Sequence, residues 1–169
     1  MKYIVYLTTN KINNKIYIGV HETENPDIFD GYLGCGANIN KPSSYNKGKT
    51  HLHNAILKYG TSAFYRQTIK EFDNLEDALN LEFELVTEEF IKRAFPSDTI
   101  AILSTHTNTN TLHTHCLINN TTLNGTHIRI DKERLEELRN LSNEICKEYG
   151  LQHSVINTKN GRAKVRYSN

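Results

Sequence analysis

Three histidines within ten residues form a candidate metal site in the second half of this 169-residue chain. They are His106, His113 and His115. Imidazole is a common metal ligand, and residues 113 and 115 of a strand face the same side, so both could chelate one ion with His106 from the end of the preceding strand. The alternative is an exposed polar loop, because the surrounding residues are rich in Thr and Asn.

Glu82 is a second candidate ligand, in a segment, 75–93, whose apolar residues recur at helical spacing. It lies two turns after Leu75 and four residues before Val86, along the apolar stripe of the expected helix. An ionised carboxylate on a buried stripe costs several kcal/mol unless it is paired or bound to a metal. The alternative is a surface residue at the edge of the stripe, and Glu84 is the second choice of ligand.

The first nineteen residues position two tyrosines. Two short apolar runs flank the polar turn Asn13-Asn14-Lys15, a pattern that predicts an antiparallel β-hairpin. Because side chains alternate between the faces of a strand, Tyr6 and Tyr17 can stand close together while their aliphatic neighbours enter the core. Taken alone, the pattern fits two structural tyrosines in a half-buried hairpin equally well.

The hairpin sequence resembles the GIY-YIG nucleases. The matching segments are Ile4-Val5-Tyr6, with Ile4 where that family usually has Gly, and Tyr17-Ile18-Gly19. Later features follow in the family's order. His21 comes after the second motif, and the loop Asp30–Gly36 follows with Cys35 in place of the usual Ser. A helix over 50–60, which begins after Thr50 and stops at Gly60, and a strand near 64–72 come next. The loop pattern is typical of a phage-associated branch of that family, which includes homing endonucleases.

The resemblance implies an α/β module that hydrolyses DNA phosphodiester bonds with a divalent cation, Mg²⁺ or Mn²⁺. It assigns Glu82 as the metal ligand and places Tyr6 and Tyr17 in the site, where one of them helps to activate water. Many family members also carry an arginine soon after the second motif, but the first arginine here is Arg66. Another residue would then have to supply the positive charge at the phosphate. His21 is the preferred candidate, although it also fits a solvated loop residue. The candidates are His21, Lys47, Lys49, His51 and His53.

The second half resembles the mobilisation relaxases, a group of His-hydrophobe-His nicking enzymes. Their motif of one His followed seven residues later by His-x-His is met by the trio at 106, 113 and 115, and the similarity continues into an expected helix over 131–149. In that family the imidazoles hold a cation that orients the scissile phosphate, and an N-terminal tyrosine attacks and becomes linked to the 5′ end. No such N-terminal strand is recognisable here. Tyr3 or Tyr6 could take the role of that nucleophile, but their sequence context is that of the other family.

Composition sets broader limits. The net charge of +1 does not demand a nucleic-acid partner, but residues 1–70 carry nine Lys and Arg against four Asp and Glu, whereas 71–93 carry two against eight. This distribution is compatible with DNA as the partner. Three widely spaced cysteines argue against a disulfide framework and favour a cytoplasmic location. No apolar run is long enough to span a membrane.

Taken together, we expect an α/β (α+β) protein with a small antiparallel sheet and flanking helices. A GIY-YIG-like module covers 1–95, and a relaxase-like segment with a basic tail covers 96–169. The helix over 75–93 fits both resemblances. The expected function is a metal-dependent DNA endonuclease of a phage or mobile element. Two alternatives stay open: a relaxase-like protein that nicks and transfers DNA strands through a His-bound metal and a tyrosine, and an inactive DNA- or metal-binding protein.

Overall fold

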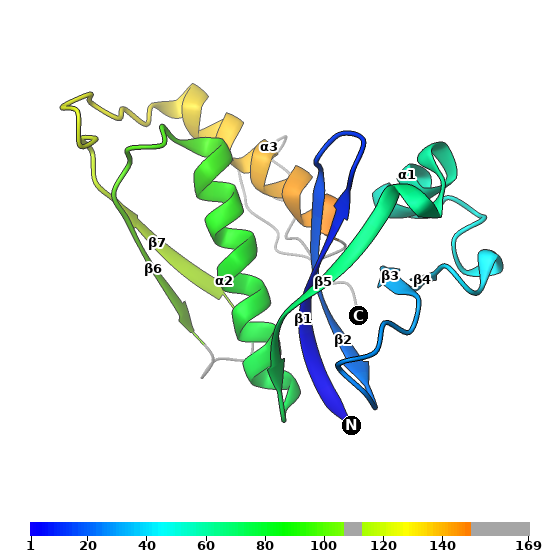
Figure 1. The fold of residues 1–169 in the computed structure, drawn as a ribbon. Helices are drawn as coiled ribbons and strands as arrows, with labels where there is room; N and C mark the ends of the chain where they lie inside the picture. Colours follow the sequence, from blue (N-terminus) through cyan, green and yellow to red (C-terminus); the bar gives the residue numbers. More distant parts are fainter. Residues whose placement is uncertain (107–112, 150–169) are drawn as a thin grey trace, which may run out of the picture.

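The computed structural model of the chain describes residues 1–106 and 113–149, which form a mixed α/β fold (Figure 1). The fold class expected from the sequence is therefore confirmed. The strands are β1 (Lys2–Asn10), β2 (Ile16–Thr23), β3 (Tyr32–Gly34), β4 (Ala37–Asn38), β5 (Phe64–Phe72), β6 (Ala101–His106) and β7 (His113–Ile118). The helices are α1 (His51–Tyr59), α2 (Leu75–Ala94) and α3 (Lys132–Tyr149), with short 3₁₀ turns η1 (Pro42–Ser44) and η2 (Thr61–Ala63).

The main sheet has the antiparallel order β2-β1-β5, so β2 is one of its edges. The predicted hairpin is confirmed: β1 and β2 pair in a regular ladder in which Val5 is opposite Val20. The polar turn between them is fixed by Asn10, whose side-chain oxygen accepts the backbone N–H of Ile12 at 2.9 Å. Asn14 has a positive φ, which asparagine tolerates better than most residues.

The predicted helices begin and end where local capping signals place them. The Thr50 side chain accepts the backbone N–H of His53 at the start of α1, and Gly60 ends that helix with a positive φ. The Asn74 side chain accepts the backbone N–H of Asp77 at the start of α2. None of the helices in the described ranges is both long and apolar enough to cross a membrane.

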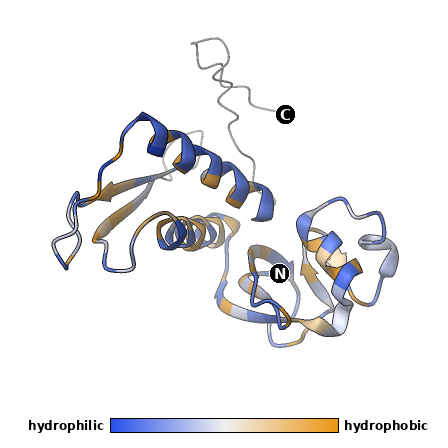
Figure 2. Cartoon of the chain, turned by 90° about the horizontal axis from the view of Figure 1, so that it is seen from above, coloured by the Kyte–Doolittle hydropathy of each residue, from blue (hydrophilic) through white to orange (hydrophobic). Residues whose placement is uncertain are grey.

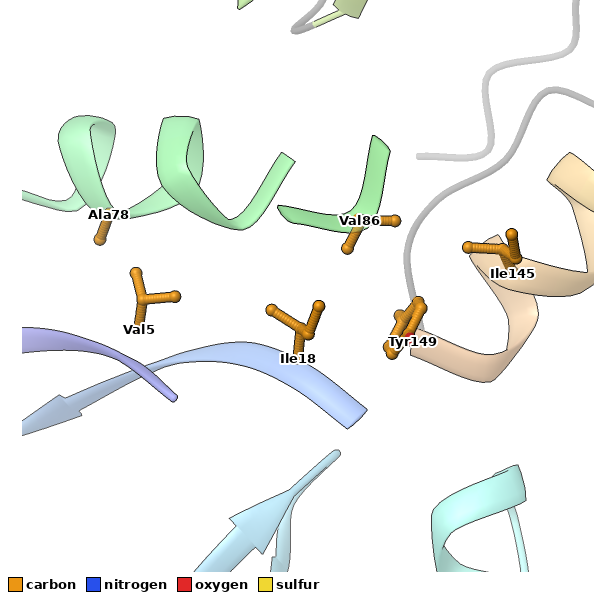
Figure 3. Packing of buried hydrophobic residues seen from close by; sticks show 6 residues of the cluster. All are labelled: Val5, Ile18, Ala78, Val86, Ile145 and Tyr149. Carbon is orange, nitrogen blue, oxygen red and sulfur yellow. The ribbon is translucent and has the colours of Figure 1, made fainter. Parts of the chain in front are cut away.

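One hydrophobic cluster joins the two halves of the sequence (Figure 3). Its buried members come from the hairpin, from α2 and from α3, and they are Val5, Ile18, Ala78, Val86, Ile145 and Tyr149. Figure 2 shows that α3 is largely hydrophilic, in keeping with the few residues that it buries. The boundary expected at residue 95 stays a prediction, but the core runs across it.

The hairpin β6–β7 packs on the other side of α2 from the main sheet (Figure 1). The sequence from Asp98 to Leu103 also predicts a strand, but β6 begins only at Ala101, because the residues before it form a turn. In that turn the backbone N–H of Thr99 donates to the Pro96 carbonyl at 3.0 Å, and the Asp98 carboxylate accepts the backbone N–H of Asn124. The predicted basic tail after residue 149 lies outside the described residues.

Candidate active site at the open edge of the sheet

The two motif tyrosines come together on one face of the main sheet. Tyr6 is opposite Gly19 in the β1–β2 ladder and Tyr17 is opposite Thr8, so all four share a face. The ring centroids of Tyr6 and Tyr17 are 6.2 Å apart. Tyr6 is 1% exposed, whereas Tyr17 is half-buried. The predicted proximity of the two rings is confirmed, and their catalytic role stays a prediction.

Two glycines leave room for these rings. A Cβ at Gly19 would lie 2.5 Å from the hydroxyl oxygen of Tyr6 and 2.9 Å from Cε1 of Tyr17. A Cβ at Gly34 would lie 2.5 Å from the same Cε1 atom, and the φ of 129° at Gly34 is itself unfavourable for other residues. Neither position therefore accommodates a larger residue without moving a tyrosine.

Glu82 reaches the open edge of β2 from α2. Outward-facing N–H groups of an edge strand have no strand partner, and here the Val20 amide donates a hydrogen bond to the Glu82 carboxylate. Glu82 is only 6% exposed. Burial raises its pKa to about 7, and the hydrogen bond from Val20 opposes that rise only in part. Within the described residues no cationic side chain pairs with it.

Glu82 and Tyr17 line the same shallow cavity of about 430 Å³, which we call the Glu82 pocket. Tyr149 of α3 also lines it, and the Tyr149 ring centroid lies 5.9 Å from that of Tyr17. Tyr6 does not line this pocket, but its ring packs against that of Tyr17, which does. Glu84, the second choice of ligand, is exposed on α2.

Burial raises the pKa of both motif tyrosines well above the ordinary value for a phenol. The effect on Tyr17 is reinforced by Cys35, whose thiol donates a hydrogen bond to the Tyr17 hydroxyl at 3.3 Å, and by the charge of Glu82. Both hydroxyls are therefore protonated at neutral pH. In this state they can donate hydrogen bonds to an anion but cannot accept a proton from water.

His21 belongs to β2 and is not a free loop residue. Its Nε2 atom lies 2.6 Å from a carboxylate oxygen of Asp30, and its ring stacks on Tyr32 with centroids 4.1 Å apart. The Tyr32 ring in turn packs edge-on against Tyr6 at 6.0 Å. The Asp30 carboxylate thus fixes the orientation of an imidazole that is one ring away from Tyr6.

The Arg66 side chain contacts both Asp30 and Tyr32, the two residues that contact His21. Its side chain is 3% exposed, its guanidinium is 3.1 Å from Asp30, and it donates to the Tyr32 carbonyl at 2.9 Å. Burial tends to raise the pKa of Asp30, but hydrogen bonds from His21 and the Tyr32 amide and the charge of Arg66 hold that pKa below its usual value. Arg66 is consequently occupied by protein groups.

Sequence reasoning assigned no role to Asp30, Tyr32 or Arg66. The register of β1 with β5 places Arg66 opposite Thr8, on the face that carries Tyr6, but that pairing joins residues far apart in the sequence. Of the other candidate cations, His53 is buried and its Nε2 lies 2.9 Å from the Cys35 carbonyl. The remaining candidates are exposed, and they are Lys47, Lys49 and His51.

The histidine trio lies elsewhere, on the β6–β7 hairpin. His106 is opposite His113 in the ladder, so the backbone brings the predicted ligands to one end of the hairpin. The ring centroids of His113 and His115 are 5.0 Å apart. No group of three or more metal-ligating side chains is found among the described residues, but the side chain of His106 lies outside them. Metal binding here stays a prediction.

Comparison with protein families finds a family whose model matches more than half of the chain. The family described as relaxase, MobA/VirD2-like, nuclease domain, matches residues 45–151. The matched range begins before α1 and includes β5, α2, the hairpin strands β6 and β7, and α3. It therefore includes Glu82, the histidine trio and Tyr149, but neither of the motif tyrosines of the first hairpin.

Comparison with curated proteins finds relatives in Enterobacteria phage T4. The chain is 43% identical to segB over 93 residues, which are 55% of this chain and 35% of segB. Against segA it is 35% identical over 86 residues, or 51% of this chain and 32% of segA. The name of segA describes it as an endonuclease, and that of segB does so provisionally. The chain spans about a third of the length of these relatives, and no solved structure matches it.

We predict that replacing Glu82 by Gln stabilises the fold at alkaline pH. Because the native pKa of Glu82 is raised from 4.5 to about 7, the folded state binds more protons than the unfolded state between these values. Wild-type stability should therefore fall through this window relative to Glu82→Gln, by about 3 kcal/mol in total. Urea unfolding from pH 4 to pH 8 measures the difference. The exposed Glu84→Gln is the matched control, and equal curves for all three proteins would contradict the burial of a charge.

We also predict that Asp30→Asn destabilises the protein by about 1.5 kcal/mol, because it removes the anion that faces buried Arg66, although solvent screens the carboxylate, which is 37% exposed. Asp27→Asn, on the same loop but without an ion pair in the described part of the chain, should change stability by less than about 0.5 kcal/mol. Since the native pKa of Asp30 is lowered, its contribution should be complete at neutral pH and disappear as the pH falls below its usual value. A neutral-pH loss no larger than that of the control would disprove the pairing.

Proposed function

Because the chain belongs, through residues 45–151, to the relaxase family of MobA/VirD2-like nuclease domains, and is similar to phage proteins named as endonucleases, we propose that it is a DNA endonuclease. We propose further that it is of the GIY-YIG type, comes from a phage or another mobile element, and hydrolyses phosphodiester bonds. The observation that supports this most is the joint lining of the Glu82 pocket by Tyr17 and Glu82, with Tyr6 against Tyr17.

Glu82 would hold the divalent cation, Mg²⁺ or Mn²⁺. The side chain fits this role because its carboxylate is buried, accepts one backbone N–H and has no cationic partner within the described residues. Mg²⁺ keeps several waters and so needs few protein ligands. When bound, such an ion supplies charge stabilisation to the phosphate under attack. The carboxylate would in turn lose the free-energy cost of an uncompensated charge.

The other side chains would bind the phosphate and move a proton. The Tyr17 hydroxyl remains protonated, so its proposed role is to donate a hydrogen bond where negative charge develops, while the buried Tyr6 ring packs against it and holds it in place. His21, oriented by Asp30, is the proposed acceptor of a proton from the attacking water. This division differs from the expectation that a tyrosine activates water, and the reason is burial of both phenols.

A relaxase-like reaction is the second candidate, and the family match favours it. The trio His106, His113 and His115 would bind the cation, and a tyrosine would attack. However, the candidate nucleophiles Tyr3 and Tyr6 lie on β1, across α2 from the histidine hairpin (Figure 1). An intramolecular attack would need a large rearrangement, so we rank this function below hydrolysis.

An inactive DNA- or metal-binding protein is the third candidate. Its support is Arg66, which is enclosed by Asp30 and the Tyr32 carbonyl and is not available to a phosphate. A nuclease without a free arginine at this face needs another cation, and His21 or the exposed residues before α1 would have to provide it.

We predict that the protein nicks or cuts supercoiled plasmid DNA in Mg²⁺ or Mn²⁺ and that EDTA stops the reaction. Glu82→Gln should lower the cleavage rate at least about 100-fold, the scale of loss when one group that stabilises a transition state is removed. Glu84→Gln and His113→Ala should cleave at the wild-type rate, because both residues lie away from the Glu82 pocket. Gel assays of the three variants measure this.

Two other results would contradict the proposal and choose between its rivals. A covalent protein adduct on the 5′ end of single-stranded DNA, lost in His113→Ala but kept in Glu82→Gln, would establish the relaxase reaction. DNA binding with neither cleavage nor an adduct, under conditions where the protein is folded, would establish the inactive binding protein.

A further inference from the structure

Tyr17 also lines a second cavity, to which Glu82 does not contribute. It has a volume of about 340 Å³, within the usual range for a small-molecule site, and we call it the α1 groove. One wall is a single face of α1 from His51 to Tyr59, and the other is the turn end of the β1–β2 hairpin. Glu148 of α3 lies at its margin.

The groove combines flat aromatic surface with positive charge. Tyr17 and Tyr59 line it, together with Lys15 and Lys58. Lys58 is exposed and forms no ion pair within the described ranges. Among the described residues that line the groove, the acidic one is Glu148, and its charge is already paired. It accepts hydrogen bonds from Lys15 at 3.3 Å and from Arg93 at 2.6 Å.

One of the residues that line the groove, Asn10, has a buried donor without an acceptor in the described part of the chain. Asn10 lines the groove and is 3% exposed. Its Oδ1 atom accepts the Ile12 N–H, which fixes the orientation of the amide, and its Nδ2 atom has no partner among the described residues. A buried N–H without an acceptor costs free energy, which an oxygen or ring nitrogen of a bound molecule would recover.

We propose that the α1 groove binds one deoxynucleotide of the DNA strand, next to the phosphodiester bond presented to the Glu82 pocket; this rests on the proposed function. The base stacks on the tyrosine rings, the phosphate contacts Lys58, and a polar edge of the base accepts from Asn10. Stacking on aromatic rings beside cations is how proteins commonly hold single-stranded nucleotides. Since Tyr17 borders both cavities, the bound nucleotide adjoins the site of cleavage.

The test is a titration of the ¹⁵N-labelled full chain with dTMP and dAMP, followed by NMR. We expect the side-chain NH₂ of Asn10 and the amides of α1 to shift. Lys58→Gln should weaken binding about tenfold, or 1.4 kcal/mol. Asn10→Asp, which keeps the acceptor for Ile12 but replaces the free donor, should weaken it at least as much.

Two controls match these changes. Lys92→Gln removes an exposed lysine from α2, and Asn25→Asp alters an asparagine that caps a backbone N–H in the same way but lies away from the groove. Both should bind the nucleotides as the wild type does. Inorganic phosphate and deoxythymidine should each bind at least about tenfold more weakly than dTMP, because each fills only part of the groove.

Several results would overturn the proposal: shifts confined to other surfaces, phosphate binding as tight as dTMP binding, or unchanged affinity in Lys58→Gln. The nuclease proposal fails separately. Glu82→Gln should bind dTMP normally, so nucleotide binding without any DNA cleavage would reject only the nuclease. Cleavage with no effect of Lys58→Gln on dTMP affinity would reject only the groove.

Discussion

A carboxylate held out of water at the open edge of a sheet is the constraint on which the first candidate site depends. Ala78 and Val86, one turn before and after Glu82, are both buried in the core. Because residues four apart lie on the same helix face, packing these two residues forces Glu82 against β2. One hydrogen bond from the Val20 amide compensates only in part, and burial still raises the pKa of Glu82 to about 7. Our proposal places a divalent cation beside this carboxylate.

The environment of that carboxylate is completed by α3, far along the chain. Tyr149 and Ile145 join Val5 and Ile18 in one core, and Tyr149 lines the Glu82 pocket. Arg93 of α2 fixes the end of α3 by pairing with Glu148 and by donating to the Tyr149 hydroxyl at 3.4 Å. The chemistry proposed for the first half is therefore shaped by a helix that belongs to the family match in the second half.

The sequence predicted those features that depend on local patterns. The hairpin, α1 and α2 follow from alternation, from caps such as Thr50 and Asn74, and from a glycine stop. Two local errors have local causes: Leu75 is exposed because it is the first residue of α2, and Asp98 turns the chain before β6. The rest of the site could not be predicted from local patterns. It depends on the register of β1 with β5 and on the packing of α3 against the β1–β2 hairpin, and both bring together residues that are far apart in the sequence.

The geometry of α2 explains how two resemblances can overlap in one chain. One side of this helix packs on β1 and β2, and the other contacts β6 and β7. Its last turns form a separate cluster in which Ala94 packs with Leu138. A helix can pack two different neighbours on two different faces. The Glu82 carboxylate on one face of α2 and the histidines on the hairpin at its other face therefore do not have to bind the same metal ion. Loss of either centre should then leave the packing around the other intact, which makes the two chemistries separable by single substitutions.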